Sequence, residues 1–162
     1  MPLPSPLYVI LDREVARGRA LPELLDAVLA GGCRLVQLRD KARPMAELLP
    51  LAQELRARCR AAQAHFIVND RADLALAVEA DGLHVGQDDL PASAARRLLR
   101  PGMTLGVSTH DEAQARQAVA ETRFGKHLRE LGEQLQMLFG RLLRHEQNEH
   151  LGDGLAVGGV EG

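Results

Sequence analysis

The first 121 residues alternate between short, continuous apolar runs and longer segments that carry an apolar stripe. Continuous runs of this length are typical of strands buried on both faces, and apolar residues three and four apart are typical of helices. The predicted strands span residues 7–11, 34–38, 65–69, 83–86 and 103–108. The predicted helices span residues 21–29, 45–60 with a late start or a bend at Pro50, 73–78, 91–100 and, after a capping box at 109–112, a segment up to about 121.

These five βα units predict an α/β fold with a parallel sheet and right-handed crossovers. Two architectures share the pattern. One is a five-stranded doubly wound sheet, and the other is the first five units of a (β/α)8 TIM barrel that is cut short. The spacing of the elements alone does not choose between them.

Composition narrows the class of protein. Lys and Arg number 20 against 22 Asp and Glu, so the net charge is −2 and there is no basic excess for binding nucleic acid. No apolar stretch approaches the roughly 20 residues of a membrane span, and the N-terminal residues carry no charged leader. Cys33 and Cys59 are too few for a disulfide framework and are predicted to be buried. The sequence therefore predicts a cytoplasmic protein that binds neither nucleic acid nor membrane.

Polar side chains gather where the predicted strands end, and parallel α/β sheets carry their chemistry at those ends. The second to fifth strands supply these candidates: Gln37, Arg39, Lys41, Asn69, Asp70, Asp89 and Ser108. Two carboxylates can share Mg²⁺ with water and phosphate oxygens, and Arg and Lys both bind phosphate. Taken singly, Asp70 also fits a cap or turn residue, and His84 fits a satisfied core histidine. The convergence of these groups predicts a site for a diphosphate held by cations.

Three segments carry motifs of several residues in a fixed order: GGCRLVQLRDK (31–41), FIVNDRADLALAVEADGLHVGQDDLP (66–91) and LGVSTHDEAQARQA (105–118). They closely resemble the thiamine phosphate synthase family, and the resemblance covers residues 7–121. It implies a (β/α)8 barrel. It also implies a transferase of thiamine biosynthesis that joins hydroxymethylpyrimidine diphosphate to thiazole phosphate and releases diphosphate.

The resemblance also implies roles for the candidate residues. Gln37, Arg39 and Lys41 match the segment that binds the pyrimidine diphosphate, and Asn69 and Ser108 match further contacts to substrate. Asp70 and Asp89 match the two Mg²⁺ ligands. Loss of diphosphate leaves a stabilised pyrimidinylmethyl cation that the thiazole nitrogen captures, so no protein nucleophile is expected.

The resemblance ends at residue 121, and residues 122–162 form a tail of a different kind. Leucines three and four residues apart predict a helix over about 126–146, and the glycine-rich end is predicted to be disordered. The substrate-binding loops that the family implies after the fifth strand are missing, so a frameshift or a gene fusion near codon 121 is one hypothesis and an evolved tail is the other. Five barrel strands leave two open edges, which the tail could cover or which a homo-oligomer could pair.

Three functions remain open at this point. The first is a thiamine phosphate synthase that is impaired as this chain. The second is a thiazole tautomerase on a similar barrel, and the third is a non-catalytic binding or assembly protein. The spacing Gln37-x-Arg39-x-Lys41, together with the two aspartates, favours the synthase.

Overall fold

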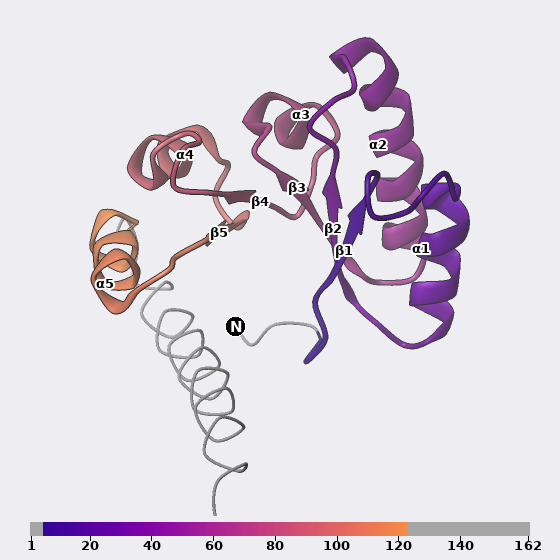
Figure 1. Cartoon of the computed structure of the whole chain (residues 1–162), viewed down its shortest axis with the longest axis horizontal. Coiled ribbons are helices and arrows are strands. Elements are labelled where there is room, and N and C mark those ends of the chain that lie inside the picture. The colour runs from indigo at the N-terminus through magenta and orange to yellow at the C-terminus, as the bar shows by residue number, and fades with distance from the viewer. Residues whose placement is uncertain (1–4, 123–162) are drawn as a thin grey trace, which may run out of the picture. The chain divides into compact units, whose positions relative to one another are not determined.

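In the computed structural model, which describes residues 5–122, five parallel strands form one sheet whose order follows the chain (Figure 1). The strands are β1 (Val9–Asp12), β2 (Leu35–Arg39), β3 (His65–Asn69), β4 (Gly82–Val85) and β5 (Thr104–Val107). The helices are α1 (Leu21–Ala30), α2 (Met45–Ala61), α3 (Ala72–Ala77), α4 (Ala92–Leu98) and α5 (Glu112–Glu121). The predicted α/β fold with five βα units is therefore confirmed.

The strand order decides between the two predicted architectures. Each strand pairs in parallel with the next one along the chain, from β1 to β5, without a reversal. A doubly wound sheet reverses its order at a switch point, which brings helices to both faces. Right-handed crossovers that always move in the same direction place every helix on the same face, which is the arrangement of a barrel. The sheet is therefore part of a TIM-barrel-like fold.

The alternation of side chains along β2 shows how the two faces differ. Val36 and Leu38 belong to the apolar core between the sheet and the helices, whereas Gln37 points to the opposite face and contacts Tyr8. The expectation that every strand is buried on both faces is wrong for β1, because Ile10 is 50% exposed. Within the described residues, β1 has one neighbouring strand, and on the face without helices Ile10 is half-exposed whereas Asp12 is buried.

Helix α2 begins at Met45 as predicted, after Pro44 in the extended conformation of an N-cap residue. The alternative of a late start at Pro50 is wrong, because Pro50 lies inside the helix. Helix α5 is capped by Asp111, whose side chain accepts a hydrogen bond of 2.8 Å from the backbone N–H of Gln114. The predicted capping box at 109–112 therefore lies two residues too early, because Asp111 and Gln114 have the same spacing.

Both cysteines are free and buried, as predicted from their number and spacing. Burial raises the pKa of Cys59 to about 12, so this thiol is protonated at neutral pH. Among residues 5–122, no helix is long and apolar enough to cross a membrane. The predicted tail helix at 126–146 and the predicted disordered end lie outside the described residues.

Candidate active site

The face of the sheet without helices carries a row of polar residues close to the carboxyl ends of the strands. The strand register aligns Asp12 of β1 with Arg39 of β2. It also aligns Asn69 of β3 with His84 of β4, and His84 with Gly106 of β5. Neighbours in a parallel register point to the same face, so these side chains share one surface. The predicted residues Arg39 and Asn69 lie in this row.

Asp12 and Arg39 form an ion pair across the first two strands. One oxygen of Asp12 also accepts hydrogen bonds from the backbone N–H groups of Glu14, at 2.8 Å, and of Val15, at 3.2 Å. Burial opposes ionisation of Asp12, but the hydrogen bonds from Arg39 and from these N–H groups outweigh it and lower the pKa of the carboxyl. Asp12 therefore stays charged and holds one side of the Arg39 guanidinium.

Lys41, Asp70 and Asp89 form the cluster that brings three of the predicted site residues together. The Nζ atom of Lys41 lies 3.2 Å from a carboxylate oxygen of Asp70, and Asp89 is close enough to raise the pKa of the Asp70 carboxyl. Asp70 takes a left-handed backbone conformation with φ of 60°, which Asp tolerates better than most residues. Its N–H donates to the carbonyl oxygen of His84 at 2.7 Å, and this bond fixes the turn after β3.

The loop after β4 positions Asp89. One oxygen of Asp89 accepts a hydrogen bond of 2.8 Å from the backbone N–H of Gly86. A Cβ atom on residue 86 would lie 2.8 Å from that same oxygen, so a larger residue would displace the carboxylate. Glycine at this position therefore permits the close approach that turns Asp89 towards Asp70.

The two carboxyl groups titrate as a pair with opposite shifts. Burial raises the pKa of Asp70, and the contact with Asp89 raises it further. Burial also opposes ionisation of Asp89, but the hydrogen bonds from Asp70 and from the N–H of Gly86 lower its pKa. Without a cation between them, the pair favours a shared proton over two negative charges.

This donor set fits a divalent cation that keeps part of its own shell. Two adjacent carboxylates attract Mg²⁺, which usually takes one or two protein carboxylates together with waters and phosphate oxygens. Among the described residues, no group of three or more His, Cys, Asp or Glu side chains could hold a metal ion. The arrangement therefore fits an ion that arrives with a phosphate-bearing ligand better than an ion enclosed by protein ligands alone.

The remaining predicted residues make contacts of their own on the same face. Gln37 is 2% exposed, and its Nε2 atom donates to the hydroxyl of Tyr8 at 2.6 Å. The hydroxyl of Ser108 lies 2.9 Å from the Nε2 atom of His84. The structure thus places the seven predicted residues in the strands or in the segments that follow them, and brings Lys41, Asp70 and Asp89 together as one cluster.

Sequence reasoning missed two polar residues of this face, Tyr8 and His84. His84 has a hydrogen-bond partner, as expected, but it lies on the face opposite the apolar core. Burial lowers the pKa of His84, so the neutral imidazole is favoured at neutral pH. The available signal was the alternation along β4, because His84 lies between Leu83 and Val85, which are both in the core.

Comparison with known proteins agrees with this architecture. The family model of thiamine monophosphate synthase matches residues 7–123. The chain is 53% identical over 112 residues to the thiamine-phosphate synthase of Moorella thermoacetica, covering 69% of this chain and 53% of that protein. It is 46% identical over 123 residues to the enzyme of the same name from Roseiflexus sp. strain RS-1, covering 73% of this chain and 52% of that protein.

A solved structure shows the same likeness in space. The thiamine phosphate pyrophosphorylase from Pyrococcus furiosus superposes with a TM-score of 0.65 at 35% identity, covering 70% of this chain and 55% of that one. The chain thus spans about half the length of the relatives that it matches. Over residues 7–123, the chain belongs to the thiamine monophosphate synthase family.

Proposed function

We propose that this chain carries the pyrimidine diphosphate half of a thiamine phosphate synthase site, in which Mg²⁺ and the basic side chains hold the diphosphate. The observation that carries the proposal is the ion pair of 3.2 Å between Lys41 and Asp70, beside a second carboxylate, Asp89, that raises the pKa of Asp70. Two neighbouring carboxylates repel each other when both are ionised, and a bound divalent cation would offset this repulsion. The same cation can also bind the negative oxygens of a diphosphate. The relatives named thiamine-phosphate synthase support this choice over a tautomerase.

Each predicted residue receives a role in this proposal. Asp70 and Asp89 would hold Mg²⁺, which when bound stabilises the negative charge of the departing diphosphate. Arg39 and Lys41 would bind phosphate oxygens directly, and Asp12 would keep the Arg39 guanidinium in position. Gln37, Asn69 and Ser108 would orient the pyrimidine through hydrogen bonds.

The proposed function of residues 1–121 stops short of the full reaction. The sequence of residues 122–162 lacks the motif that the resemblance implies for binding thiazole phosphate, and the family model matches no further than residue 123. Capture of the pyrimidinylmethyl cation needs the thiazole nitrogen held within about 3–3.5 Å of the reacting carbon. We therefore expect the chain to bind pyrimidine diphosphate with Mg²⁺ and to form thiamine phosphate very slowly.

Calorimetry of the full chain tests the proposal. Hydroxymethylpyrimidine diphosphate should bind in the presence of Mg²⁺, and Asp70→Asn should weaken this binding at least about tenfold because a metal ligand is lost. The matched control is Asp73→Asn on α3, which removes a carboxylate that pairs with Arg71 at the surface. Equal binding by wild type and Asp70→Asn would remove the metal assignment. Turnover near that of a full-length relative would show that the tail completes the acceptor site.

A further inference from the structure

A cavity of about 520 Å³ lies beside the proposed active site and contains none of its seven residues. The cavity is formed by the loop after β1, the first turn of α1, and residues from the start of α2 and the loop before it. Its lining residues are Arg13, Glu14, Arg17, Gly18, Arg19, Ala20, Leu21, Pro22, Arg43 and Leu51. A volume of this size is within the range of pockets that bind small organic molecules.

The charge of the lining is strongly one-sided, with four arginines against one glutamate. Each guanidinium has five N–H donors. Among the described residues, the side chains of these arginines make one hydrogen bond, from Nε of Arg19 to the carbonyl oxygen of Ala16 at 3.1 Å, and two ion pairs, of Arg13 and Arg43 with Asp40. Several of the donors therefore have no partner within residues 5–122, and a ligand with several negative oxygens would use them best.

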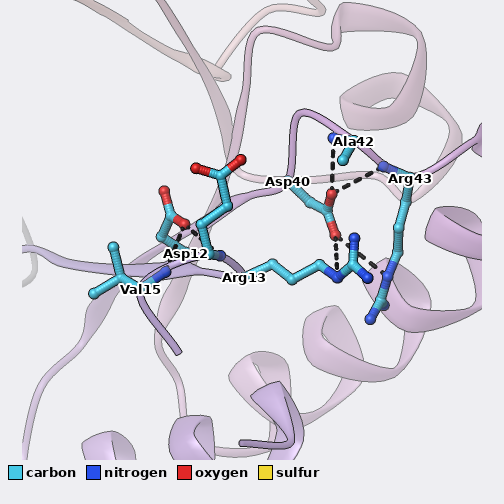
Figure 2. Close-up of polar contacts among 7 residues, drawn as sticks. Asp12, Arg13, Val15, Asp40, Ala42 and Arg43 are labelled. Atoms are coloured by element: carbon cyan, nitrogen blue, oxygen red, sulfur yellow. Dashed lines mark hydrogen bonds and ion pairs between the residues drawn. The ribbon is translucent and has the colours of Figure 1, made fainter. Parts of the chain in front are cut away.

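One buried carboxylate, Asp40, holds two of these arginines in place (Figure 2). Its side chain is 1% exposed, and its Oδ2 atom lies 3.3 Å from Nε of Arg43 and 4.0 Å from Nε of Arg13. The Oδ1 atom accepts hydrogen bonds from the backbone N–H groups of Ala42 and Arg43, whereas Oδ2 has ion-pair distances without a well-aligned hydrogen bond. A single carboxylate therefore lies at ion-pair distance from two guanidinium groups and compensates only one of their two positive charges.

The first turn of α1 adds a second attraction for anions. Ala20 is the N-cap residue of this ten-residue helix, and its side chain cannot cap the free backbone N–H groups. Ala20, Leu21 and Pro22 all line the cavity. An uncapped helix N-terminus favours a negative group, although Glu23 in the first turn already supplies part of that charge.

The turn that carries the arginines is shaped by two successive left-handed residues. Arg17 and Gly18 have φ values of 51° and 82°, and this turn brings the chain from the end of β1 back to α1. The N–H of Arg19 then donates to the carbonyl oxygen of Ala16 at 3.1 Å. Arg17 and Arg19 are therefore placed on either side of a tight turn at the cavity wall.

We propose that this cavity is a second anion-binding site, which takes a phosphorylated organic molecule of up to about nucleotide size. The arginines and the start of α1 bind the phosphate groups, and the apolar residues Leu21, Pro22 and Leu51 contact the organic part. The site differs from the proposed active site because Arg39 and Lys41 pair with Asp12 and Asp70, whereas Arg43 lines the cavity and pairs with Asp40. The loop 40–43 belongs to both.

Nuclear magnetic resonance of the ¹⁵N-labelled full chain tests the proposal without Mg²⁺, so that the carboxylate pair does not recruit the probe. Three probes separate the contribution of the phosphate groups to binding from that of the organic part. They are ADP, inorganic diphosphate and adenosine. ADP and diphosphate should shift the amide signals of Arg17, Gly18 and Arg19 more than those of Asn69 and Gly86. ADP should bind more tightly than diphosphate because of its apolar body, and adenosine alone should not saturate the site.

Two variants make the assignment decisive. Arg17→Glu should weaken ADP binding at least about tenfold, because it removes one charge-assisted contact and introduces repulsion. Arg97→Glu on α4 is the matched control, because Arg97 is exposed and lies outside the cavity lining, and it should change affinity less than about twofold. Arg19→Gln serves as a second variant if Arg17→Glu unfolds. Shifts confined to Asn69 and Gly86, equal losses with Arg97→Glu, or no saturation at about 10 mM ADP would overturn the proposal.

Discussion

The two faces of the sheet are made by the same five strands and have opposite characters. The face towards the helices carries fully buried apolar side chains, such as Val36, Phe66 and Leu83. The other face carries Gln37 and His84, which make hydrogen bonds, together with Ile10 and Ile67, and the carboxylate cluster follows the ends of its strands. The difference separates two tasks: one face supplies most of the stability, and the other face is free to carry chemistry.

The largest expected effect belongs to the helix-covered face. Phe66 is 0% exposed at the centre of the core, so Phe66→Ala should lower the free energy of unfolding by about 3–5 kcal/mol. The matched substitution on the other face is Ile10→Ala, which removes a half-exposed side chain and should cost less than about 1.5 kcal/mol. Urea unfolding followed by circular dichroism measures both. Equal costs would mean that the uncovered face is packed as tightly as the core.

A second substitution tests how closely the polar face is assembled. A Cβ atom on Gly106 would lie 2.4 Å from Nδ1 of His84, so Gly106→Ala should displace the imidazole and break its contact with Ser108. We expect a cost of about 1–3 kcal/mol, as for other overpacked positions, and a shift of the His84 ring signals in NMR spectra.

The control for this substitution is Gly31→Ala at the end of α1. Its backbone φ is −72°, and a Cβ atom there would meet its nearest neighbour at an ordinary distance of 3.4 Å. Stability should therefore stay constant or rise by about 0.4–1 kcal/mol. A cost at Gly31 equal to that at Gly106 would show that the effect comes from losing any glycine rather than from crowding His84.

The contrast between the faces also explains which features could be predicted from sequence. The apolar runs revealed all five strands, because buried strands need continuous apolar residues whatever their order in the sheet. The order of the strands in the sheet could not be predicted from the apolar runs, because it depends on how each helix packs against the sheet rather than on the local sequence pattern. The barrel was favoured over the doubly wound sheet only by the resemblance to a known family. The pairing of each strand with the next one along the chain confirmed the barrel.

Some residues of the candidate site could likewise be predicted from the sequence, and others could not. Asp70 and Asp89 could be placed at strand ends from their position after apolar runs, but their contact depends on the turn at Asp70 and on the space left by Gly86. Tyr8 and His84 were hidden inside apolar runs, where sequence pattern alone assigns a residue to the core. The arginine cavity draws on two loops that are more than twenty residues apart, and no local motif connects Arg13 with Arg43.

The smallest expected effect concerns the ion pair at the end of β1 and its dependence on pH. The pKa of Asp12 is lowered in the folded chain, since Arg39 and two backbone N–H groups outweigh the effect of burial. A carboxyl with a depressed pKa stabilises the fold above its unfolded pKa of about 3.9, and this contribution is lost as the pH falls through the folded value. Asp12→Asn, which keeps a side-chain oxygen for the two N–H groups, should therefore cost about 1 kcal/mol at pH 7.

The cost of Asp12→Asn should shrink towards zero as the pH falls through the lowered pKa of Asp12 in the folded chain, because the wild-type carboxyl then also becomes neutral. Chemical unfolding at several pH values measures the difference, with Glu14 and Arg39 as the neighbouring charged groups that both proteins share. The control is Asp88→Asn, an exposed residue after β4, which should change stability by less than about 0.5 kcal/mol throughout. If the loss of stability in Asp12→Asn stays constant down to about pH 2, Asp12 stabilises the fold through its shape and hydrogen bonds rather than through its charge. Arg39 would then be free to turn towards a substrate phosphate without losing a stabilising partner.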